Sequence, residues 1–426
     1  MGTLSFIHCS DLHLGCQQYN ELQRWLDFGR AFGEIVSYAI QHKVNYFFIG
    51  GDLFHHRSIN AQTLEQAIVE LKRLKDAGIK VIAIEGNHDK AFYLEGQSWM
   101  NFLNSQGYLH LLKPEFIEGK LILNPYDGVK GCVYQADGIK IYGLGYLGAT
   151  TKQRLEEIAE WLEPSEDFTV VLLHAAVDKL MGQDMAGVNS KVFEKFNGVV
   201  DYFALGHIHS RQESDPCIFN PGAPESVHID EAKNDRQKGF YHVIVHGKEK
   251  TVNFVESKRR DIYYVSIDLT GINNPEDAAD KIIQEMDTLE LPVREEKPMV
   301  QIILYGEVDF HSYAIDVQGI SEVIKLKYHC LIVDIVNNVN LHEAVEQNSY
   351  SGFDRVSIER NVIRKMICQE RPEFKNMEDK IVDLILKIKN QAMDNVGPEE
   401  IVSTIEEDMG SMLLSLTEAA VTEEKV

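Results

Sequence analysis

Five apolar runs of the chain each end in side chains that proteins use to bind metal ions, and this pattern limits the folds open to it. The runs are residues 6–8, 46–49, 81–84, 170–173 and 202–205. A turn of glycine or asparagine after such a run is cheap because both tolerate positive φ. The polar residues that follow the runs are Asp11, His13, Asp52, Asn87, His88, Asp89, His174, His207 and His209. If the runs are buried strands, the carboxylates, the amide and the imidazoles meet at one edge, and together they have the composition of a dinuclear metal site.

The chemistry of such a site explains why these residue types occur together. Two metal ions about 3.5–4 Å apart activate a water molecule and hold the oxygens of a phosphate during in-line displacement. A carboxylate can bridge them, and mixed oxygen and imidazole ligands favour Mn, Fe, Zn or Co over Mg alone. Each motif also has a simpler interpretation: Asp11-Leu12-His13 as a turn, His174 as a core histidine, and residues 206–209 as a loop with exposed rings. The occurrence of all five, each after an apolar run, favours the metal site.

The pattern of strands and helices predicts an α/β sandwich of two sheets over residues 1–258. Helical spacing indicates helices at 21–43, 61–77 and 96–106, with Asn60 as the N-cap of the second and Gly78 as its stop. The less strictly apolar runs at 139–142 and 241–245 suggest a partly exposed second sheet. A length of 426 residues leaves room for more than one domain. We expect a small α+β domain at 259–345 and an acidic helical segment at 346–426, either a solvated tail or a docking element.

Composition excludes several classes of protein. No run approaches the ~18 consecutive apolar residues of a membrane span, and no basic-then-apolar segment at the N-terminus indicates a signal peptide. Six cysteines without a C-x-x-C pair fit reduced thiols in a cytoplasmic protein. A formal charge of −24 argues against a generally basic nucleic-acid binder. Two divalent ions would, however, supply positive charge where a phosphate must arrive.

The five motifs, in this order, resemble those of the calcineurin-like metallophosphoesterases. Within that superfamily the chain resembles the SbcD nucleases, called meiotic recombination eleven in archaea and eukaryotes. The segments that carry the closer resemblance are Ser10-Asp11-Leu12-His13-Leu14-Gly15, Gly51-Asp52-Leu53-Phe54-His55, Ile141-Tyr142-Gly143-Leu144, Pro221-Gly222-Ala223-Pro224-Glu225 and Lys238-Gly239-Phe240-Tyr241. The resemblance covers about residues 1–340 and is most specific before residue 260.

The resemblance implies a role for each site residue. One metal ion would be held by Asp11, His13, Asp52 and His209, and the other by Asp52, Asn87, His174 and His207, with Asp52 as the bridge. His88 would stabilise charge on the scissile phosphate and protonate the leaving oxygen, and His55 would orient the DNA phosphate. We expect Asp89 to orient His88, as outer carboxylates commonly do. His56 doubles the imidazole beside His55, so either could contact phosphate.

The resemblance also implies a function and partners. We expect a metal-dependent DNA exonuclease and endonuclease acting in break repair, with two divalent ions, Mn²⁺ above others. The alternatives are a small-molecule phosphodiesterase, such as one for cyclic nucleotides, and a non-catalytic scaffold on the same fold. Family members form homodimers through helices of the nuclease domain, here 61–77 (Ile68, Leu71) and 96–106, although these residues could equally cover the sheet. A SbcC-type SMC-like ATPase would bind the C-terminal helical segment, at 353–367 or 381–388.

Overall fold

The structure is a computed structural model of the chain. It describes residues 3–91, 96–177, 188–214, 216–234, 237–289, 291 and 296–341, and beyond these 360, 363–364, 367, 377–393, 401–406 and 408–409. The chain divides into two compact units. The first consists of Met1–Val265, Leu291–Ile302 and Lys325–Asp334, and the second of Ser266–Glu290, Ile303–Ile324 and Ile335–Val426.

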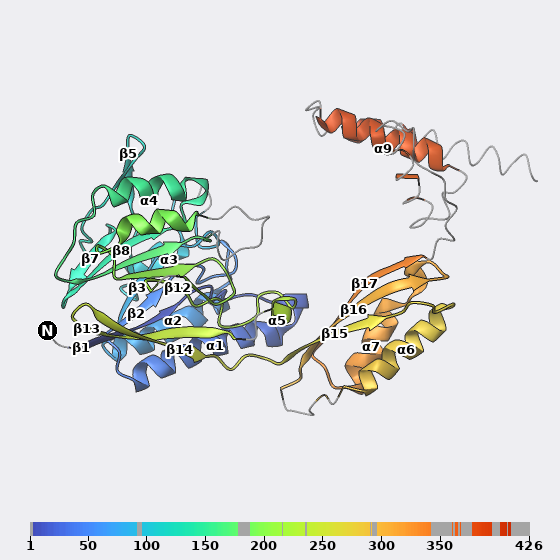
Figure 1. The fold of residues 1–426 in the computed structure, drawn as a ribbon, viewed down its shortest axis with the longest axis horizontal. Helices are drawn as coiled ribbons and strands as arrows, with labels where there is room; N and C mark the ends of the chain where they lie inside the picture. Colours follow the sequence, from blue (N-terminus) through green and yellow to red (C-terminus); the bar gives the residue numbers. More distant parts are fainter. Residues whose placement is uncertain are drawn as a thin grey trace, which may run out of the picture. The chain divides into compact units, whose positions relative to one another are not determined.

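Two six-stranded sheets form the body of the first unit (Figure 1). The first sheet has the order β14-β13-β1-β2-β3-β4, and its strands β1 to β4 are parallel. The bounds of its strands are Glu249–Glu256 (β14), Gly239–His246 (β13), Thr3–Cys9 (β1), Tyr46–Ile49 (β2), Lys80–Ala83 (β3) and His110–Leu111 (β4). Because β1, β2 and β3 are parallel, their carboxyl ends lie at the same edge.

The second sheet has the order β11-β12-β10-β9-β8-β7 and is parallel from β8 to β12. The bounds of its strands are Gln212–Ser214 (β11), Ile218–Asn220 (β12), Tyr202–Gly206 (β10), Phe168–His174 (β9), Ile139–Gly145 (β8) and Val133–Ala136 (β7). A hairpin of β5 (Glu115–Ile117) and β6 (Lys120–Ile122) stands apart from both sheets. The predicted two-sheet α/β sandwich is therefore confirmed. The expectation of a partly exposed second sheet was wrong, because β8 and β13 are largely buried and β13 belongs to the first sheet.

Helices cover the outer faces, so that the unit has four layers. The helices of the first unit are α1 (Leu22–Gln41), α2 (Ala61–Asp76), α3 (Trp99–Ser105), α4 (Thr151–Ala159) and α5 (Glu231–Asn234), with 3-10 turns at Gln18–Asn20, Gly148–Thr150 and Ser190–Phe196. One core joins α1, α2 and α3 to the first sheet, a second fills the space between the sheets, and a third lies under α4 and Ser190–Phe196. As predicted, the Asn60 side chain caps α2 by accepting from the amide of Thr63, and Gly78 follows its end with φ +74°.

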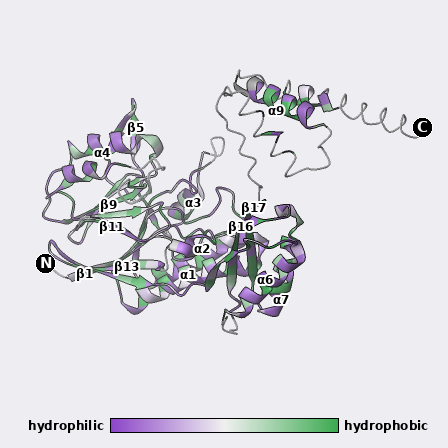
Figure 2. Cartoon of the chain, turned by 45° about the vertical axis from the view of Figure 1, so that its right-hand side comes forward, coloured by the Kyte–Doolittle hydropathy of each residue, from purple (hydrophilic) through white to green (hydrophobic). Residues whose placement is uncertain are grey.

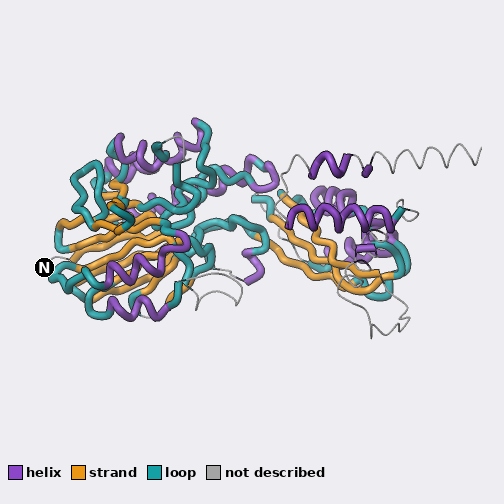
Figure 3. The backbone as a smooth tube through the Cα atoms, turned by 90° about the horizontal axis from the view of Figure 1, so that it is seen from above, coloured by secondary structure: helices purple, strands orange, loops and turns teal. Residues whose placement is uncertain are grey.

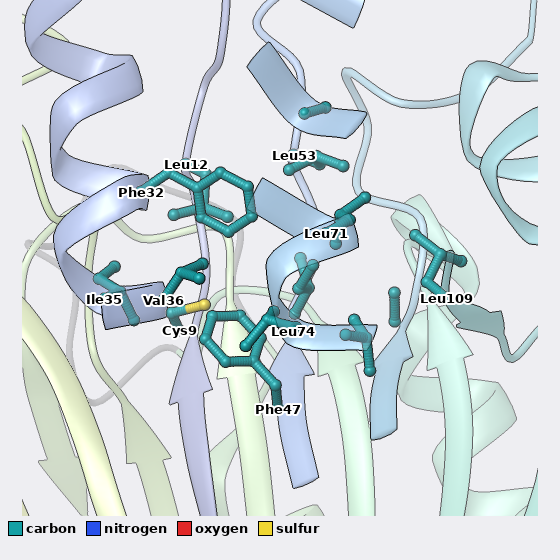
Figure 4. Packing of buried hydrophobic residues seen from close by; sticks show 14 of the residues in the cluster. Cys9, Leu12, Phe32, Ile35, Val36, Phe47, Leu53, Leu71, Leu74 and Leu109 are labelled. Carbon is teal, nitrogen blue, oxygen red and sulfur yellow. The ribbon is translucent and has the colours of Figure 1, made fainter. Parts of the chain in front are cut away.

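The packing of α2 corrects one expectation about the dimer. Figure 4 shows Leu71 and Leu74 of α2 in the same cluster as Phe47 of β2 and Phe32 of α1. Leu71 is fully buried in this core. It therefore covers the sheet and is not available to a second copy of the chain, whereas Ile68 is only partly buried.

A three-stranded sheet with two helices follows the sandwich in sequence (Figure 3). Its order is β15-β16-β17, and the bounds are Ile262–Asp268 (β15), Met299–Val308 (β16), Ile332–Leu341 (β17), Pro275–Asp287 (α6) and Val317–Lys327 (α7), with a 3-10 turn at Ser312–Ala314. Asn274 caps α6 and Pro275 occupies its first turn. The apolar faces of α6 and α7 are buried at Ile282 and Ile324. Residues 262–341 thus combine strands with helices, while the boundaries 259–345 of a separate domain stay a prediction.

Only part of the predicted C-terminal helical segment is described. Helix α9 spans Glu378–Met393 and includes the predicted docking stretch 381–388, while most of 353–367 lies outside the described residues. In Figure 2 hydrophobic and hydrophilic residues alternate along α9, as in a helix with one apolar face. Among the described helices, none has the length and apolar character to cross a membrane.

Candidate metal centre

The predicted ligands of both sheets converge between the carboxyl ends of their central strands. Asp11 and His13 follow β1, Asp52 follows β2, Asn87 follows β3, and the remaining histidines end or follow β9 and β10. Asp52, from the first sheet, approaches His174, from the second, with 3.2 Å between Oδ2 and Nε2. The parallel order of both sheets thus brings the distant motifs together.

One group of ligand atoms comes from Asp11, His13 and His209, whose ligand atoms lie within 4.8 Å of one another. The Nε2 atoms of His13 and His209 are 3.1 Å apart, and Asp52 Oδ2 lies 4.0 Å from Nε2 of His13. Ser10 donates its hydroxyl to Asp11 at 2.7 Å, which fixes that carboxylate. Two facing imidazoles beside two carboxylates form a cluster that a divalent cation can enter.

A second group comes from Asp52, His174 and His207, again within 4.8 Å. Nε2 of His174 also lies 3.2 Å from the amide oxygen of Asn87. The two groups are linked, because the amide of His207 donates to both oxygens of Asp11 at 3.1 Å. Asp52 lies close to both groups, which is the arrangement that a bridging carboxylate requires.

The backbone at the site adopts conformations that ordinary residues avoid. Asp11, His13, Asp52 and His207 all have positive φ, between 46° and 94°. Such conformations cost energy and persist only where surrounding contacts hold them. Here the amides of Asp11 and His13 donate to the carbonyls of Gly51 and Asp52, both at 3.0 Å, and tie the first two loops together.

Gly86 leaves room for the carboxylate of Asp52. A Cβ atom added to Gly86 would lie 2.0 Å from Oδ1 of Asp52 and 2.5 Å from its amide nitrogen. No side chain can occupy that space without displacing the carboxylate. The glycine of the Gly86-Asn87-His88-Asp89 turn is therefore required by close approach, in addition to the turn itself.

Hydrogen bonds at Nδ1 orient two of the imidazoles. Nδ1 of His174 donates to the carbonyl of Gly50 at 2.8 Å, and Nδ1 of His209 donates to Glu231 at 2.7 Å. With the proton held at Nδ1, the lone pair of Nε2 faces the ligand cluster in each ring. This tautomer is the one that binds a metal ion through Nε2.

His88 and His55 lie beside the first ligand group. The ring of His88 is 5.1 Å from that of His13, and its Nδ1 donates to the carbonyl of His55 at 2.7 Å. Nδ1 of His55 lies 3.3 Å from Nδ1 of His13. His56 is exposed, so of the two neighbouring imidazoles His55 is the one that faces the cluster.

An open cavity of about 520 Å³ adjoins these histidines and gives access to the site. It is lined by His55, His56, Arg57, Ser58, Asn87 and His88. Arg57 donates to the backbone carbonyl of Asn87 at 3.3 Å. The cavity is thus polar and brings positively charged and neutral donors to the side of the site where His88 lies.

We expected Asp89 to orient His88, but its carboxylate contacts backbone amides instead. Its carboxylate accepts from the amides of Leu53, Phe54 and Gly86 at 3.3, 3.1 and 3.0 Å. It therefore joins the turn after β3 to the turn after β2. The carbonyl of His55, and not the carboxylate of Asp89, holds the His88 ring, so the expectation for Asp89 is corrected.

The electrostatics of the cluster favour positive charge. Burial alone would lower the pKa of His174, but the charge and hydrogen bond of Asp52 raise that pKa to about 9. Burial likewise opposes ionisation of Asp52, yet His174 and His13 hold the pKa of Asp52 below its usual range. Burial and then the charge of Asp52 raise the pKa of Asp89 to about 7. A cation at Nε2 of His174 is stabilised by the same carboxylate that attracts a proton there.

Sequence reasoning missed three residues that contact the cluster or its ligands. Glu231 and Lys238 hold His209; Lys238 stands in one of the family-like segments, but no such segment contains Glu231. The ring of Tyr146 lies 5.6 Å from that of His207. Tyr146 follows β8, so an apolar run ending in a polar residue was a usable signal. Cys16, for which the sequence offered no explanation, is buried in a small apolar cluster, and burial raises its pKa to about 12.

The donor set fits two divalent ions. Each group presents imidazole Nε2 atoms and carboxylate oxygens, and an amide oxygen completes the second. This mixture suits ions of the first transition row. Asp11, His13, Asp52 and His174 are almost wholly buried, so that their desolvated carboxylates and aligned lone pairs require a cation as partner.

Comparisons with known proteins agree with this arrangement. Residues 4–211 match the family model described as calcineurin-like phosphoesterase. The DNA double-strand break repair protein Mre11 of Archaeoglobus fulgidus is 30% identical over 342 residues, which cover 75% of this chain and 71% of that protein. The protein of the same name from Sulfurisphaera tokodaii is 27% identical, over 72% of this chain and 75% of the relative. A double-strand break repair protein MRE11 of rice is 21% identical over 72% of this chain and 45% of that protein.

Proposed function

The chain belongs to the Mre11 family within the calcineurin-like phosphoesterases, and from this premise we propose that it is a metal-dependent DNA nuclease of double-strand break repair. The observation that carries the proposal is the pair of ligand groups that share Asp52. All seven predicted ligands stand at the ends of the two sheets, so a scaffold that has lost its catalytic residues is disfavoured. Two described relatives with the break-repair name favour DNA over a cyclic nucleotide as substrate.

We propose that the ligands divide between the two ions as the family resemblance implies. Asp11, His13 and His209 would hold one ion, Asn87, His174 and His207 the other, and Asp52 would bridge them. Bound there, two divalent ions supply a nucleophile at neutral pH and neutralise charge on the phosphate. The chain's own residues would orient the scissile phosphate at this edge and exclude alternative geometries.

His88 is the proposed general acid. Its Nδ1 proton is engaged by the carbonyl of His55, so Nε2 is the atom left to give a proton to the leaving oxygen of the DNA. His55 lies beside both His13 and His88 and lines the access cavity, where it can donate to a phosphate oxygen. Asp89 acts at a distance, by keeping the two loops that carry these histidines in register.

The remaining parts of the proposal concern metal, partners and domains. Mn²⁺ is the proposed ion, since it accepts both oxygen and imidazole ligands. Residues 1–258 would form the nuclease domain, 259–345 a DNA-capping domain, and 346–426 a docking segment for a SbcC-type ATPase, of which α9 is the described part. The protein would act as a homodimer in the cytoplasm, through partly buried side chains such as Ile68 and Phe102.

A comparison of His88→Ala with His174→Ala tests the assignment. We expect His88→Ala to keep both ions and to lose about 10²–10⁴-fold in DNA cleavage, because a general acid is removed and no ligand is lost. His174→Ala should lose metal as well as activity. Cleavage of linear duplex and single-stranded DNA, hydrolysis of cyclic nucleotides, and metal content are measured on the same samples with Mn²⁺.

Three results would contradict the proposal. If His88→Ala lost as much metal as His174→Ala, His88 would be a ligand. If it cleaved DNA at the parent rate, the general-acid role would be wrong. If the parent hydrolysed cyclic nucleotides and left DNA intact, the substrate class would be wrong and the small-molecule alternative correct.

A further inference from the structure

The carboxylate of Glu231 contacts His209, one of the proposed metal ligands, and residues close to it. Its Oε1 accepts from Nδ1 of His209 at 2.7 Å, and its Oε2 accepts from Nζ of Lys238 at 2.8 Å. The amides of Val227 and His228 each donate to it at 3.2 Å. The side chain is only 12% exposed. Four donors thus fix this carboxylate in one orientation.

Lys238 also contacts His209, through its backbone. Its ammonium donates to the backbone carbonyl of His209 at 2.7 Å as well as to Glu231, and its side chain is 1% exposed. A lysine so deeply buried requires a partner of opposite charge. Glu231 and Lys238 therefore form a closed pair that holds His209 by its ring and by its backbone.

At the other metal position, the group that supports the ring of His174 is of a different kind. There Nδ1 of His174 donates to the backbone carbonyl of Gly50, which is neutral. A carboxylate behind an imidazole makes the ring a stronger ligand than a carbonyl does, because it stabilises positive charge spread onto the ring. The two halves of the centre therefore differ in how their histidines are supported.

We propose that Glu231, held by Lys238, is a positioning residue for His209 and sets the affinity of the Asp11–His13–His209 position for its ion. This inference rests on the proposed dinuclear centre and adds to it an asymmetry between the two ions. Removal of the carboxylate frees the ring of His209 to rotate and to carry its proton on Nε2, where it competes with the metal. The ion at the His174 position keeps its own ligands and its own support.

The side chains of His209, His228 and Glu231 form another group whose ligand atoms lie within 4.8 Å of one another, and such a group is a candidate for an additional cation. The ammonium of Lys238 argues against this, because it already stands 2.8 Å from Glu231 and would repel a divalent ion. Nδ1 of His209 is also occupied by the short contact to Glu231. The geometry supports a role in orientation and not a separate site.

The test measures the binding of Mn²⁺ to the full chain by calorimetry and records the electron paramagnetic resonance spectrum of the bound ions. Glu231→Gln keeps the size of the side chain and removes its charge, and Glu231→Ala removes it entirely. We expect both variants to bind one ion as the parent does and the second about 10–100-fold more weakly. The spectrum should change from that of a coupled pair to that of a single ion at limiting Mn²⁺.

Asp27→Asn is the matched control for a general effect of disturbing a buried ion pair. Asp27 is buried and pairs with Arg24 at 2.7 Å, but it is not among the proposed ligands or their partners. This control should retain both ions. Glu231→Asp, which restores the charge on a shorter side chain, should recover part of the lost affinity.

Three outcomes of these measurements would contradict the inference. Parent-like binding of both ions by Glu231→Gln and Glu231→Ala would overturn the positioning role while leaving the dinuclear centre intact. An equal loss of both ions would overturn the assignment to one position. A parent chain that binds no Mn²⁺ would overturn the proposed function together with this inference.

Discussion

Asp27→Asn should strongly destabilise the first unit, although the two side chains are nearly equal in size. Asp27 is the centre of a buried charge network. Its carboxylate accepts from Nη1 of Arg24 at 2.7 Å and from Nε and Nη2 of Arg260 at 2.6 and 2.7 Å. Arg24 also donates to Glu225 at 3.0 Å. Arg24, Arg260, Asp27 and Glu225 are at most 2% exposed, and Arg30, whose side chain is 30% exposed, also pairs with Asp27 at 3.3 Å. The network ties α1 to the segment that leads into β15.

The magnitude follows from what the substitution leaves behind. Asparagine retains one acceptor oxygen but no charge, so the guanidinium of Arg260 would lose its carboxylate partner and that of Arg24 would keep only Glu225. Breaking a buried pair in this way costs about 3–5 kcal/mol, since an uncompensated charge remains. With a urea m-value of roughly 3 kcal/mol/M, the midpoint of the first unit's unfolding should fall by about 1–2 M.

The same carboxylate makes stability depend on pH. Burial by itself raises the pKa of Asp27, but hydrogen bonds and charges from Arg260 and Arg24 outweigh it and hold that pKa below its ordinary value. A group whose folded pKa is depressed stabilises the fold above the unfolded pKa, about 3.9, and loses that contribution as the pH falls through the folded value. The stabilities of the parent and of Asp27→Asn should therefore begin to converge below about pH 4 and meet only below the depressed pKa of the folded state.

Asp137→Asn is the control, because Asp137 pairs with Lys80 at 2.8 Å with its side chain 66% exposed. An exposed pair contributes about 0–1 kcal/mol. The double variant Arg24→Met with Asp27→Leu removes a cation together with its anion and should recover part of the loss. The reasoning is refuted if the urea midpoint of Asp27→Asn moves no further than that of Asp137→Asn.

Three more predictions concern the metal centre and the dimer. Asp52→Asn should lose one or both ions by metal analysis, since the carboxylate of Asp52 lies close to histidines of both ligand groups, and two tightly bound ions would contradict the bridge. Gly86→Ala should lose metal and about 1–3 kcal/mol of stability in calorimetric melting, because the added Cβ meets Asp52 at 2.0 Å, and an unchanged melting temperature with full metal would contradict it. If α3 lies at the dimer interface, Phe102→Glu should give a folded 48.5 kDa monomer in sedimentation. Leu71 is buried, so Leu71→Glu should fail to fold. A folded dimer of Phe102→Glu would exclude this interface.

The positions of the ligands could be predicted because each depends on one strand. An apolar run that ends in Gly-Asp or Gly-Asn places the next polar side chain at a strand end, whatever the rest of the fold does. Asp52 and His174 come from different sheets, and the parallel order of each sheet brings their strand ends together. The N-cap at Asn60 was predictable for the same reason, since a cap acts within three residues.

Contacts between segments far apart in the chain could not be predicted in this way. Glu231 acts on His209 from 22 residues away, through a four-residue helix that no periodicity reveals. The face of α2 that carries Leu71 is set by the sheet beneath it, and a helix with apolar residues on more than one side does not show which side is covered. The hydrogen-bond partner of the His88 ring is the backbone carbonyl of His55. Every residue has such a carbonyl, so the sequence does not indicate which one is used.

The left-handed conformations at Asp11, His13, Asp52 and His207 link the fold to its chemistry. A non-glycine residue with positive φ is costly, and four of them at one centre would not persist without compensation. The compensation is internal: the loops after β1 and β2 exchange backbone hydrogen bonds, and the amide of His207 donates to Asp11. These hydrogen bonds are all between groups of the chain itself, and they stabilise the loops that carry the ligands. A centre organised in this way can present the same geometry to every phosphate of a DNA strand as it is degraded.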